Sequence, residues 1–395
     1  MRSDLSSLKL DLSDLKEVRS SLAEKIRQGL PSGRGEIAAL PTFLFPPQPK
    51  KDSQALVIDI GGTNLRAAVV EISSSGNVRF SRPPTIRPLE LEWGSAKDFF
   101  GVQAELALSL KPPDNLPLGY CFSYPSRALP GGEAVHLQWN KELRVPGVIG
   151  KKLGNLLREA LAARGYTVPR VRVLNDTVAA LLGGDLTYRR QYGLASLIGL
   201  IVGTGTNLSA YFPTSQLGQR VPAELLGMGP MAVNLESGNF HPPHLSDFDE
   251  ELDAGRDDAG EQRMEKAVSG RFLPQLFTYI REGRTSPPYP ETREIFRLAR
   301  TPEDEGAETA RLLVNRSAAL AASALAGLID TLETSGKIGI LTEGGVINKN
   351  PDYRERIRRR LAELLGDDPD RPNRFELLQL ENVNLIGAAA AAGQI

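Results

Sequence analysis

Hydrophobic residues recur along the chain with two different periods. Residues 13–28 carry apolar side chains at helical spacing, which predicts one amphipathic helix with Gly29 as its C-cap. Shorter apolar runs bounded by glycine, proline or polar residues predict strands instead. In chain order the pattern predicts two or three strands within 55–80, a strand at 116–125, a helix at 148–165, a strand running into a helix over 168–184, a hairpin at 195–212, helices through most of 247–335, a strand with a glycine turn at 337–346, and helices at 351–365 and 387–394. Strands that alternate with helices predict an α/β fold, and the proline-rich, charged stretch 45–54 predicts a linker before the first strand.

Two strand–turn–strand segments have nearly the same sequence. VIDIGGTNLRAAVV covers 57–70 and LIVGTGTNLSAYF covers 200–212, and alignment of their glycine turns places Val202 opposite Asp59. Glycine turns let a backbone approach a ligand closely and aim consecutive N–H groups at it, which suits phosphate. A carboxylate in one turn can hold Mg²⁺ through water, because Mg²⁺ prefers one or two carboxylates together with substrate phosphates. A third turn, at 343–345, is a candidate for the other end of a nucleotide; the alternative is that these are ordinary turns whose glycines have a positive φ.

Composition and charge narrow the function classes. The chain has 395 residues, of which 41% are hydrophobic and 24% charged, and this suits two globular domains with a sizeable core. A formal net charge of −1 argues against nucleic acid as a partner. Cys121 is the single cysteine, which rules out an intramolecular disulfide or a zinc site of several thiolates and fits a reducing compartment. Because no apolar run approaches the ~20 residues that span a bilayer, we expect a cytoplasmic protein without a membrane partner.

Several other motifs predict no chemistry. GVIGKK has neither the spacing nor the hydroxyl residue of a P-loop, and GMGPMA at 227–232 follows no convincing strand, as a dinucleotide fingerprint would. HPPH at 241–244 is more typical of a chance loop than of a metal site, because two prolines separate the histidines. The basic segment 354–360 lies on a helix whose apolar residues are predicted to face inward, so its arginines indicate a solvated face instead of a nucleic-acid patch.

Ten segments, in this order, are similar to those of a known family: DIGGTNLR, GYCFSYPSR, HLQWNKEL, LNDTVAALL, GLIVGTGTN, AVNLESGNF, DFDEELD, EKAVSGRFL, ALAASALAGLI and EGGVINKNPDY. On these segments the chain resembles the hexokinase/glucokinase type within the actin-like ATPase superfamily, nearly end to end from ALPTF at 39–43 to GAAAAAG at 387–393. The resemblance implies an α/β, two-domain, actin-like ATPase (ribonuclease H-like) fold with duplicated βββαβα units and a cleft between the domains. Because the chain is short beside eukaryotic members, it is most similar to a compact bacterial-type hexokinase.

The resemblance implies a hexokinase, an ATP:hexose 6-phosphotransferase that uses ATP and Mg²⁺ and feeds glycolysis. Phosphoryl transfer to a hydroxyl needs a proton acceptor, and Asp176 in LNDT, where a strand passes into a helix, is the expected base. The alternative for an isolated aspartate at this place is a helix cap. Lys141 is expected to neutralise charge on the transferred group as well as to bind sugar. The implied hexose-binding residues are Ser123, Asn140, Lys141, Asn175, Asp176, Asn207, Glu236 and Glu265.

The nucleotide is expected at the three glycine turns. Arg66 follows the first turn and can pair with phosphate or with a neighbouring carboxylate. Asp59 and Asp176 are the expected Mg²⁺ carboxylates, acting through water. The expected nucleotide-binding residues are Asp59, Gly61, Gly62, Thr63, Asn64 and Arg66 in the first turn, Gly203, Thr204 and Gly205 in the second, and Gly344 and Gly345 in the third.

Two departures from the family pattern bear on the sugar. Asn140 stands where eukaryotic members carry threonine, and ESGNF replaces their EWGAF. Glucose is the first expectation, with fructose, mannose or an amino sugar as alternatives, and a non-catalytic sugar-binding sensor on the same fold is the alternative from another class.

The resemblance and the linker at 45–54 also predict a division of the chain. The predicted small domain covers 55–172 and 386–395, and the large domain covers 1–44 and 176–385, with hinges at about 45–54 and 173–176. Hexose and ATP are the expected partners, and the protein is expected to be a monomer or a homodimer.

Overall fold

The computed structural model describes residues 4–139, 143–368 and 373–394. The chain forms two compact units. Unit 1 comprises Met1–Ala39, Leu200–Leu208 and Leu235–Gln379, and unit 2 comprises Leu40–Gly199, Ser209–Asn234 and Leu380–Ile395. The domain limits predicted from the sequence stay a prediction.

Unit 2 contains a sheet with the strand order β4-β3-β2-β6-β9, to which β5 adds by pairing with β3. β2 pairs antiparallel with β3 and parallel with β6, which in turn pairs parallel with β9. The carboxyl ends of β2, β6 and β9 therefore meet at one edge of the sheet. The bounds are β2 (Ser53–Ile60), β3 (Asn64–Ile72), β4 (Val78–Phe80), β5 (Thr85–Pro88), β6 (Leu118–Phe122) and β9 (Val171–Leu174).

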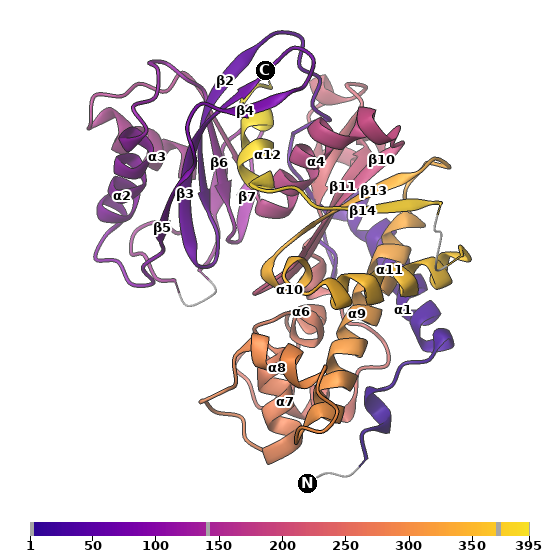
Figure 1. The fold of residues 1–395 in the computed structure, drawn as a ribbon. Helices are drawn as coiled ribbons and strands as arrows, with labels where there is room; N and C mark the ends of the chain where they lie inside the picture. Colours follow the sequence, from indigo (N-terminus) through magenta and orange to yellow (C-terminus); the bar gives the residue numbers. More distant parts are fainter. Residues whose placement is uncertain (1–3, 140–142, 369–372, 395) are drawn as a thin grey trace. The chain divides into compact units, whose positions relative to one another are not determined.

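Helices cover both faces of this sheet (Figure 1). α2 (Ala96–Ser109) and α3 (Leu153–Ala162) pack against each other on one face, where the sheet contributes alternate residues such as Leu56 and Ile58 to the core. α12 (Val383–Ala392) lies on the other face and packs against α4 (Asp176–Tyr192). Bare backbones meet there, since a Cβ on Gly387 would be 1.8 Å from the carbonyl oxygen of Ala179. The small residues of the closing helix thus permit a very close helix crossing.

The second sheet repeats the topology of the first. Its order is β1-β12-β11-β10-β13-β14, and without the short β1 this is third-second-first-fourth-fifth in chain order, as in β4-β3-β2-β6-β9. A helix follows the fifth strand in both copies, α4 after β9 and α12 after β14. The duplicated unit expected from the sequence is confirmed. The bounds are β1 (Leu40–Pro41), β10 (Ser196–Val202), β11 (Thr206–Pro213), β12 (Pro230–Asn234), β13 (Ile338–Glu343) and β14 (Phe375–Leu378).

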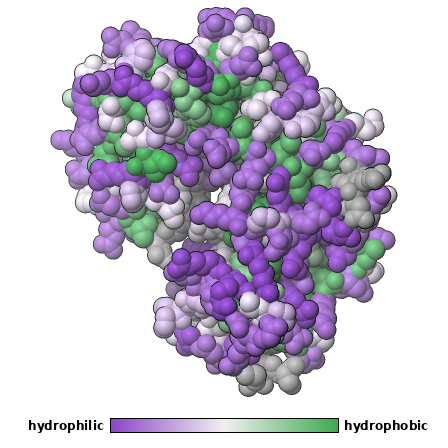
Figure 2. All heavy atoms as spheres, viewed as in Figure 1, coloured by the Kyte–Doolittle hydropathy of each residue, from purple (hydrophilic) through white to green (hydrophobic). Residues whose placement is uncertain are grey.

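Unit 1 is mainly helical, and α9 (Ala307–Ile329) is its core helix. By length and composition α9 could cross a membrane, but 89% of its apolar window is buried inside the protein. It contacts α1 and α11 along much of its length, together with shorter helices. Hydrophilic residues form most of the face seen in Figure 2. The other helices of this unit are α1 (Leu12–Ser32), α5 (Asp247–Ala254), α6 (Arg263–Val268), α7 (Leu273–Glu282), α8 (Thr292–Leu298), α10 (Gly345–Asn348) and α11 (Pro351–Leu365).

The predicted end of the first helix is wrong. α1 runs through Gly29 and ends at Ser32, where Gly33 has the left-handed φ of 65° that a C-cap glycine adopts. Gly29 is required for a different reason, since a Cβ there would be 1.9 Å from the carbonyl oxygen of Ile37. The glycine permits close approach of the following segment and does not end the helix.

Candidate active site

The first glycine turn joins β2 to β3 beside a buried carboxylate. Asp59 lies opposite Arg66 of β3 and Cys121 of β6 in the sheet register. Its side chain is only 3% exposed, and Arg66 Nη1 lies 3.8 Å from Asp59 Oδ2. The other oxygen, Oδ1, is buried without a hydrogen-bond partner among the described residues. Of the two roles considered for Arg66, pairing with a carboxylate is the one seen in this structure.

Burial is the main influence on the pKa of Asp59. Desolvation raises the pKa of Asp59 to about 6. The charge of Arg66 and a hydrogen bond with the Cys121 thiol lower this pKa, but less than burial raises it, and the negative charge of Asp176 adds to the rise. Burial also raises the pKa of the Cys121 thiol well above its usual value, so this group stays neutral. Arg66 therefore only partly compensates the buried carboxylate of Asp59.

The backbone of the first turn leaves room for a ligand. The N–H of Gly61 donates to the carbonyl oxygen of Asn64 at 3.1 Å, which closes the turn. Neither Gly61 nor Gly62 has a positive φ, so a left-handed backbone is not the reason for glycine here. A Cβ on Gly61 would meet its nearest neighbouring atom only at 3.8 Å. Neither a left-handed conformation nor crowding by a neighbour therefore accounts for glycine at position 61.

Asp176 begins α4 immediately beyond the carboxyl end of β9. The preceding residue, Asn175, is the N-cap, and its side chain accepts a hydrogen bond from the N–H of Thr177 at 2.9 Å. Asp176 Oδ1 accepts from the same N–H at 2.8 Å, while Oδ2 has no hydrogen-bond partner in the described part of the chain. The charge of Asp176 raises the pKa of Asp59 and of Tyr124, which shows that it acts on the first turn. Asn175 therefore supplies the cap, and Oδ1 of Asp176 shares the same N–H.

The segment after β6 joins this group. Ser123 donates its backbone N–H to the carbonyl oxygen of Ile60 at 3.1 Å, and the Tyr124 hydroxyl donates to the carbonyl oxygen of Gly61 at 3.3 Å. Sequence reasoning missed Tyr124, although it follows Ser123 directly in the SYP segment. Asp59, Ser123, Asn175 and Asp176 thus lie at the carboxyl ends of three neighbouring parallel strands, where open α/β sheets bind their ligands.

The second and third glycine turns meet in unit 1. Gly203 N donates to Gly205 O at 2.9 Å, which closes the second turn. A Cβ on Gly203 would be 3.3 Å from Gly344 Cα, and one on Gly344, whose φ is +107°, would be 2.5 Å from the carbonyl oxygen of Val202. Glycine is required here because two backbones approach each other closely. Gly345 begins the short helix α10, so N–H groups at its N-terminus adjoin the paired turns.

Three predicted hexose-binding residues also come together in unit 1. Glu265 Oε2 accepts a hydrogen bond from the N–H of Thr206 at 3.0 Å, and Asn207 Oδ1 accepts from the N–H of Ser237 at 3.1 Å. A Cβ on Gly238 would lie 3.3 Å from Glu265 Cβ, so the 236–238 segment is packed against α6. Glu236 has a left-handed φ of 54°, an uncommon conformation for a residue with a side chain and one that concentrates at functional sites.

The remaining sequence calls fall elsewhere. Asn140 and Lys141 lie outside the described residues. His244 lies between two carboxylates, with Nε2 at 2.8 Å from Glu17 and Nδ1 at 3.8 Å from Asp14. His241 Nε2 lies 3.7 Å from Glu250, so the two histidines of HPPH contact different carboxylates.

The basic helix follows its predicted pattern. In α11 the apolar residues Ile357, Leu361 and Leu364 are buried. On its polar side Arg358 forms an ion pair with Glu355 at 2.6 Å. The predicted inward face of this helix is therefore confirmed.

Two family models, both described as Hexokinase, together match most of the chain, at residues 1–186 and at residues 197–281 and 294–394. Hexokinase-1 of Saccharomyces cerevisiae is 29% identical over 69% of this chain and 58% of its own length. Hexokinase-3 of Oryza sativa is 27% identical over 96% of this chain and 86% of its own length. The chain thus spans a little over half of one of these curated relatives and most of the other.

Solved structures show the same fold. A hexokinase from Schistosoma mansoni complexed with glucose superposes with a TM-score of 0.82 at 24% identity, covering 98% of this chain and 96% of that one. A ROK family glucokinase from Streptomyces griseus in complex with glucose and AMPPNP gives a TM-score of 0.54 at 18% identity, covering 85% and 98%. Together with the repeated strand order, these likenesses confirm the α/β fold of the actin-like ATPase type.

Proposed function

The chain belongs to the hexokinase family, whose members phosphorylate sugars, and from this premise we propose that it transfers the γ-phosphoryl group of MgATP to the 6-hydroxyl group of a hexose, with glucose as the first candidate. The observation that carries the proposal is the pair of carboxylates Asp59 and Asp176 beside the first glycine turn. One is buried and poorly compensated, and the other keeps an oxygen without a partner among the described residues. Phosphoryl transfer needs such an arrangement, because catalysis consists mainly of positioning and charge stabilisation.

Asp176 acts as the base in this proposal. Its Oδ1 is held by the N–H of Thr177, so the carboxylate has a fixed orientation, and Oδ2 takes the proton of the attacking hydroxyl. Lys141 would neutralise charge on the transferred group. The proposed hexose ligands are Ser123, Asn140, Lys141, Asn175, Asp176, Asn207, Glu236 and Glu265.

The glycine turns bind the nucleotide in this proposal, through N–H groups that face phosphate oxygens. A neighbour of the same fold binds the ATP analogue AMPPNP, which supports ATP as the donor. The proposed contacts are Asp59, Gly61, Gly62, Thr63, Asn64 and Arg66 in the first turn, Gly203, Thr204 and Gly205 in the second, and Gly344 and Gly345 in the third.

Mg²⁺ fits the residues of the first turn. Asp59 Oδ1 is a buried carboxylate oxygen without a hydrogen-bond partner in the described ranges, and the charge of Asp176 acts on it. We assign both carboxylates to the metal, through its water shell. When bound, Mg²⁺ supplies positive charge to the nucleotide phosphates. The free Cys121 thiol further supports a cytoplasmic enzyme. We propose hexose and ATP as its partners, and a monomer or homodimer as its assembly.

Turnover with defined sugars tests the proposal. ADP release is measured with MgATP and glucose, fructose, mannose or N-acetylglucosamine, and hexose binding is measured separately by calorimetry. Asp176→Asn should lower kcat by about 10²–10⁴-fold on every accepted hexose while binding persists, because the base is lost and the shape is kept.

Asp185→Asn is the matched control. Asp185 lies on the same helix, but its partner is Arg189, so this variant should keep its kcat. Tight hexose binding without turnover by the natural chain would replace the kinase with a sugar-binding sensor. Failure to bind or phosphorylate any of the four sugars would overturn the proposed substrate class.

A further inference from the structure

Glu265 sits on a helix that cannot hold itself in place. α6 has only six residues, Arg263–Val268, and its N-cap residue Gln262 has a left-handed φ of 50° and makes no side-chain capping bond. Isolated helices of this length are unstable in water, because nucleation costs more than so few hydrogen bonds return. The place of Glu265 must therefore be set by contacts that α6 makes with the rest of unit 1.

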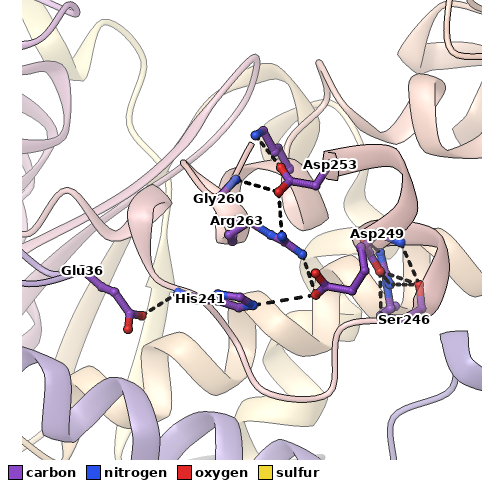
Figure 3. A network of polar contacts seen from close by, with 10 residues as sticks. Glu36, His241, Ser246, Asp249, Asp253, Gly260 and Arg263 are labelled. Carbon is purple, nitrogen blue, oxygen red and sulfur yellow. Dashed lines mark hydrogen bonds and ion pairs between the residues drawn. The ribbon is translucent and has the colours of Figure 1, made fainter. Parts of the chain in front are cut away.

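Asp253 supplies charged contacts to both ends of α6 (Figure 3). It lies at the end of α5, where Oδ1 accepts a hydrogen bond from Lys266 Nζ at 2.6 Å and Oδ2 accepts from Arg263 Nη1 at 2.7 Å. Oδ2 also accepts from the N–H of Gly260 at 2.7 Å, which ties down the loop between the two helices. One carboxylate thus binds both Arg263 and Lys266, the residues that flank Met264 and Glu265 in α6.

The grip is dry. The side chains of Asp253, Arg263 and Lys266 are 6%, 5% and 10% exposed. Charge-assisted hydrogen bonds in such surroundings are strong, and loss of one partner leaves buried charge behind. Burial raises the pKa of Asp253, but the bonds from Lys266 and Gly260 and the two nearby cations outweigh burial, so the net pKa is lowered and the group is charged at neutral pH. Glu250 also reaches Arg263, at 2.6 Å, but its side chain is 50% exposed.

The other side of α6 holds the second glycine turn. Glu265 Oε2 accepts from the N–H of Thr206, and a Cβ on Gly205 would be 2.5 Å from that same oxygen. Immediately after the helix, Gly270 N donates to Gly203 O at 2.8 Å and Arg271 N donates to Thr204 O at 3.4 Å. A shift of α6 would therefore move Glu265 and the turn together.

We propose that Asp253 is a positioning residue for the hexose and for the second glycine turn, acting through Glu265. It holds Arg263 and Lys266, they fix α6, and α6 fixes the Glu265 carboxylate against Thr206. This inference rests on the proposed function, since the hexose contact of Glu265 belongs to that proposal.

A double-mutant cycle tests the inference. The hexose Kd is measured by calorimetry, and kcat and KM by ADP release, for the natural chain, Asp253→Asn, Glu265→Gln and the double variant. We expect Asp253→Asn to raise the hexose Kd about tenfold and Glu265→Gln to raise it at least as much. Because Asp253 acts through Glu265, the double variant should stay within about twofold of Glu265→Gln, whereas independent effects multiply.

Two further variants keep the test decisive. Glu250→Gln removes the exposed carboxylate from the same arginine and should leave the hexose Kd within twofold of the natural value. Lys266→Gln removes one of the three bonds to Asp253, together with the contacts of Lys266 to the carboxylate and carbonyl oxygen of Asp258, and should raise the Kd about threefold. It serves in place of Asp253→Asn if that variant does not fold.

Each outcome has one meaning. Multiplicative effects in the double variant, or a natural Kd in Asp253→Asn or in its substitute, would overturn the positioning role. A natural chain that binds hexose without turnover would overturn the kinase proposal alone, because the cycle is read from Kd. A natural chain that binds no hexose would overturn both.

Discussion

At the scale of single residues, one ion pair of unit 1 is deeply buried. Arg316 of α9 and Asp249 of α5 have side chains that are 1% and 8% exposed. Arg316 Nη2 donates to Asp249 Oδ1 at 2.8 Å, and Nη1 donates to Oδ2 and to the Ser246 hydroxyl. Burial raises the pKa of Asp249, but the charge and hydrogen bonds of Arg316 and the bonds from Ser246 lower it more, so the folded value lies below the ordinary one.

This pair predicts acid sensitivity. A carboxyl whose pKa is depressed in the folded state stabilises the protein above its unfolded pKa of about 4, and the contribution is lost as the pH falls from there toward the folded value. The free energy of unfolding, measured with urea at pH 7, 5 and 3, should therefore fall toward pH 3. In Asp249→Asn the fall should be shallower, and the protein should be about 3–5 kcal/mol less stable at pH 7, because Arg316 stays buried without its partner.

Removal of both charges is the control. Asp249→Asn combined with Arg316→Met should be more stable than Asp249→Asn alone, because no uncompensated charge remains. Equal pH dependence in the natural chain and Asp249→Asn would show that other carboxylates govern acid unfolding.

At the scale of elements, we expect Gly29→Ala in α1 to destabilise the protein, although helix propensity favours alanine over glycine. Alanine normally stabilises a helix interior by about 1 kcal/mol relative to glycine. In α1 a Cβ at position 29 would lie 1.9 Å from the carbonyl oxygen of Ile37, so Gly29→Ala must push the following segment away. We expect a loss of about 1–3 kcal/mol, the usual cost of overpacking, in urea unfolding. Ser20→Ala in the same helix should be neutral or stabilising, and a stabilised Gly29→Ala would contradict the packing found here.

The same residue shows where sequence patterns stop. Apolar periodicity predicted α11 with its observed bounds. Short apolar runs placed β2, β3, β6, β10 and β11, because these strands are buried along most of their length. It did not find β12 or the short β1, which become strands only through pairing with distant partners. Gly29 was misjudged because a local pattern cannot show that the carbonyl oxygen of Ile37 occupies the space that a Cβ at position 29 would need.

At the scale of the whole molecule, ligand binding should appear as stability. A hexose that binds only the folded protein adds about 2.7 kcal/mol at 100 times its Kd, which for a chain of this size raises Tm by about 3 °C. Differential scanning fluorimetry should show this rise with the accepted hexose, in the natural chain and in Asp176→Asn alike. L-glucose is the matched control and should leave Tm unchanged, and a rise with both enantiomers would mean that the sugars act as general osmolytes.

The sequence predicted the residues proposed to bind ligand better than the residues that hold them in place. Asp59, Asp176 and the glycine turns stand in short motifs whose spacing indicates phosphate chemistry. Tyr124 and Asp253 were missed, since a tyrosine and a charged helix end are common everywhere. Only the fold shows that Tyr124 reaches the first turn and that Asp253 grips the helix of Glu265.

The packing of α12 has a consequence for how the protein is made. This helix covers one face of a sheet whose strands are synthesised early, yet about 190 residues separate the end of α4 from the start of α12. At 5–20 residues per second, a ribosome needs roughly ten to forty seconds to cross that interval. Throughout that time the face that will meet Gly387 and its alanine neighbours lacks the helix that covers it in the folded protein. The nascent chain is therefore expected to expose this apolar surface until α12 leaves the exit tunnel.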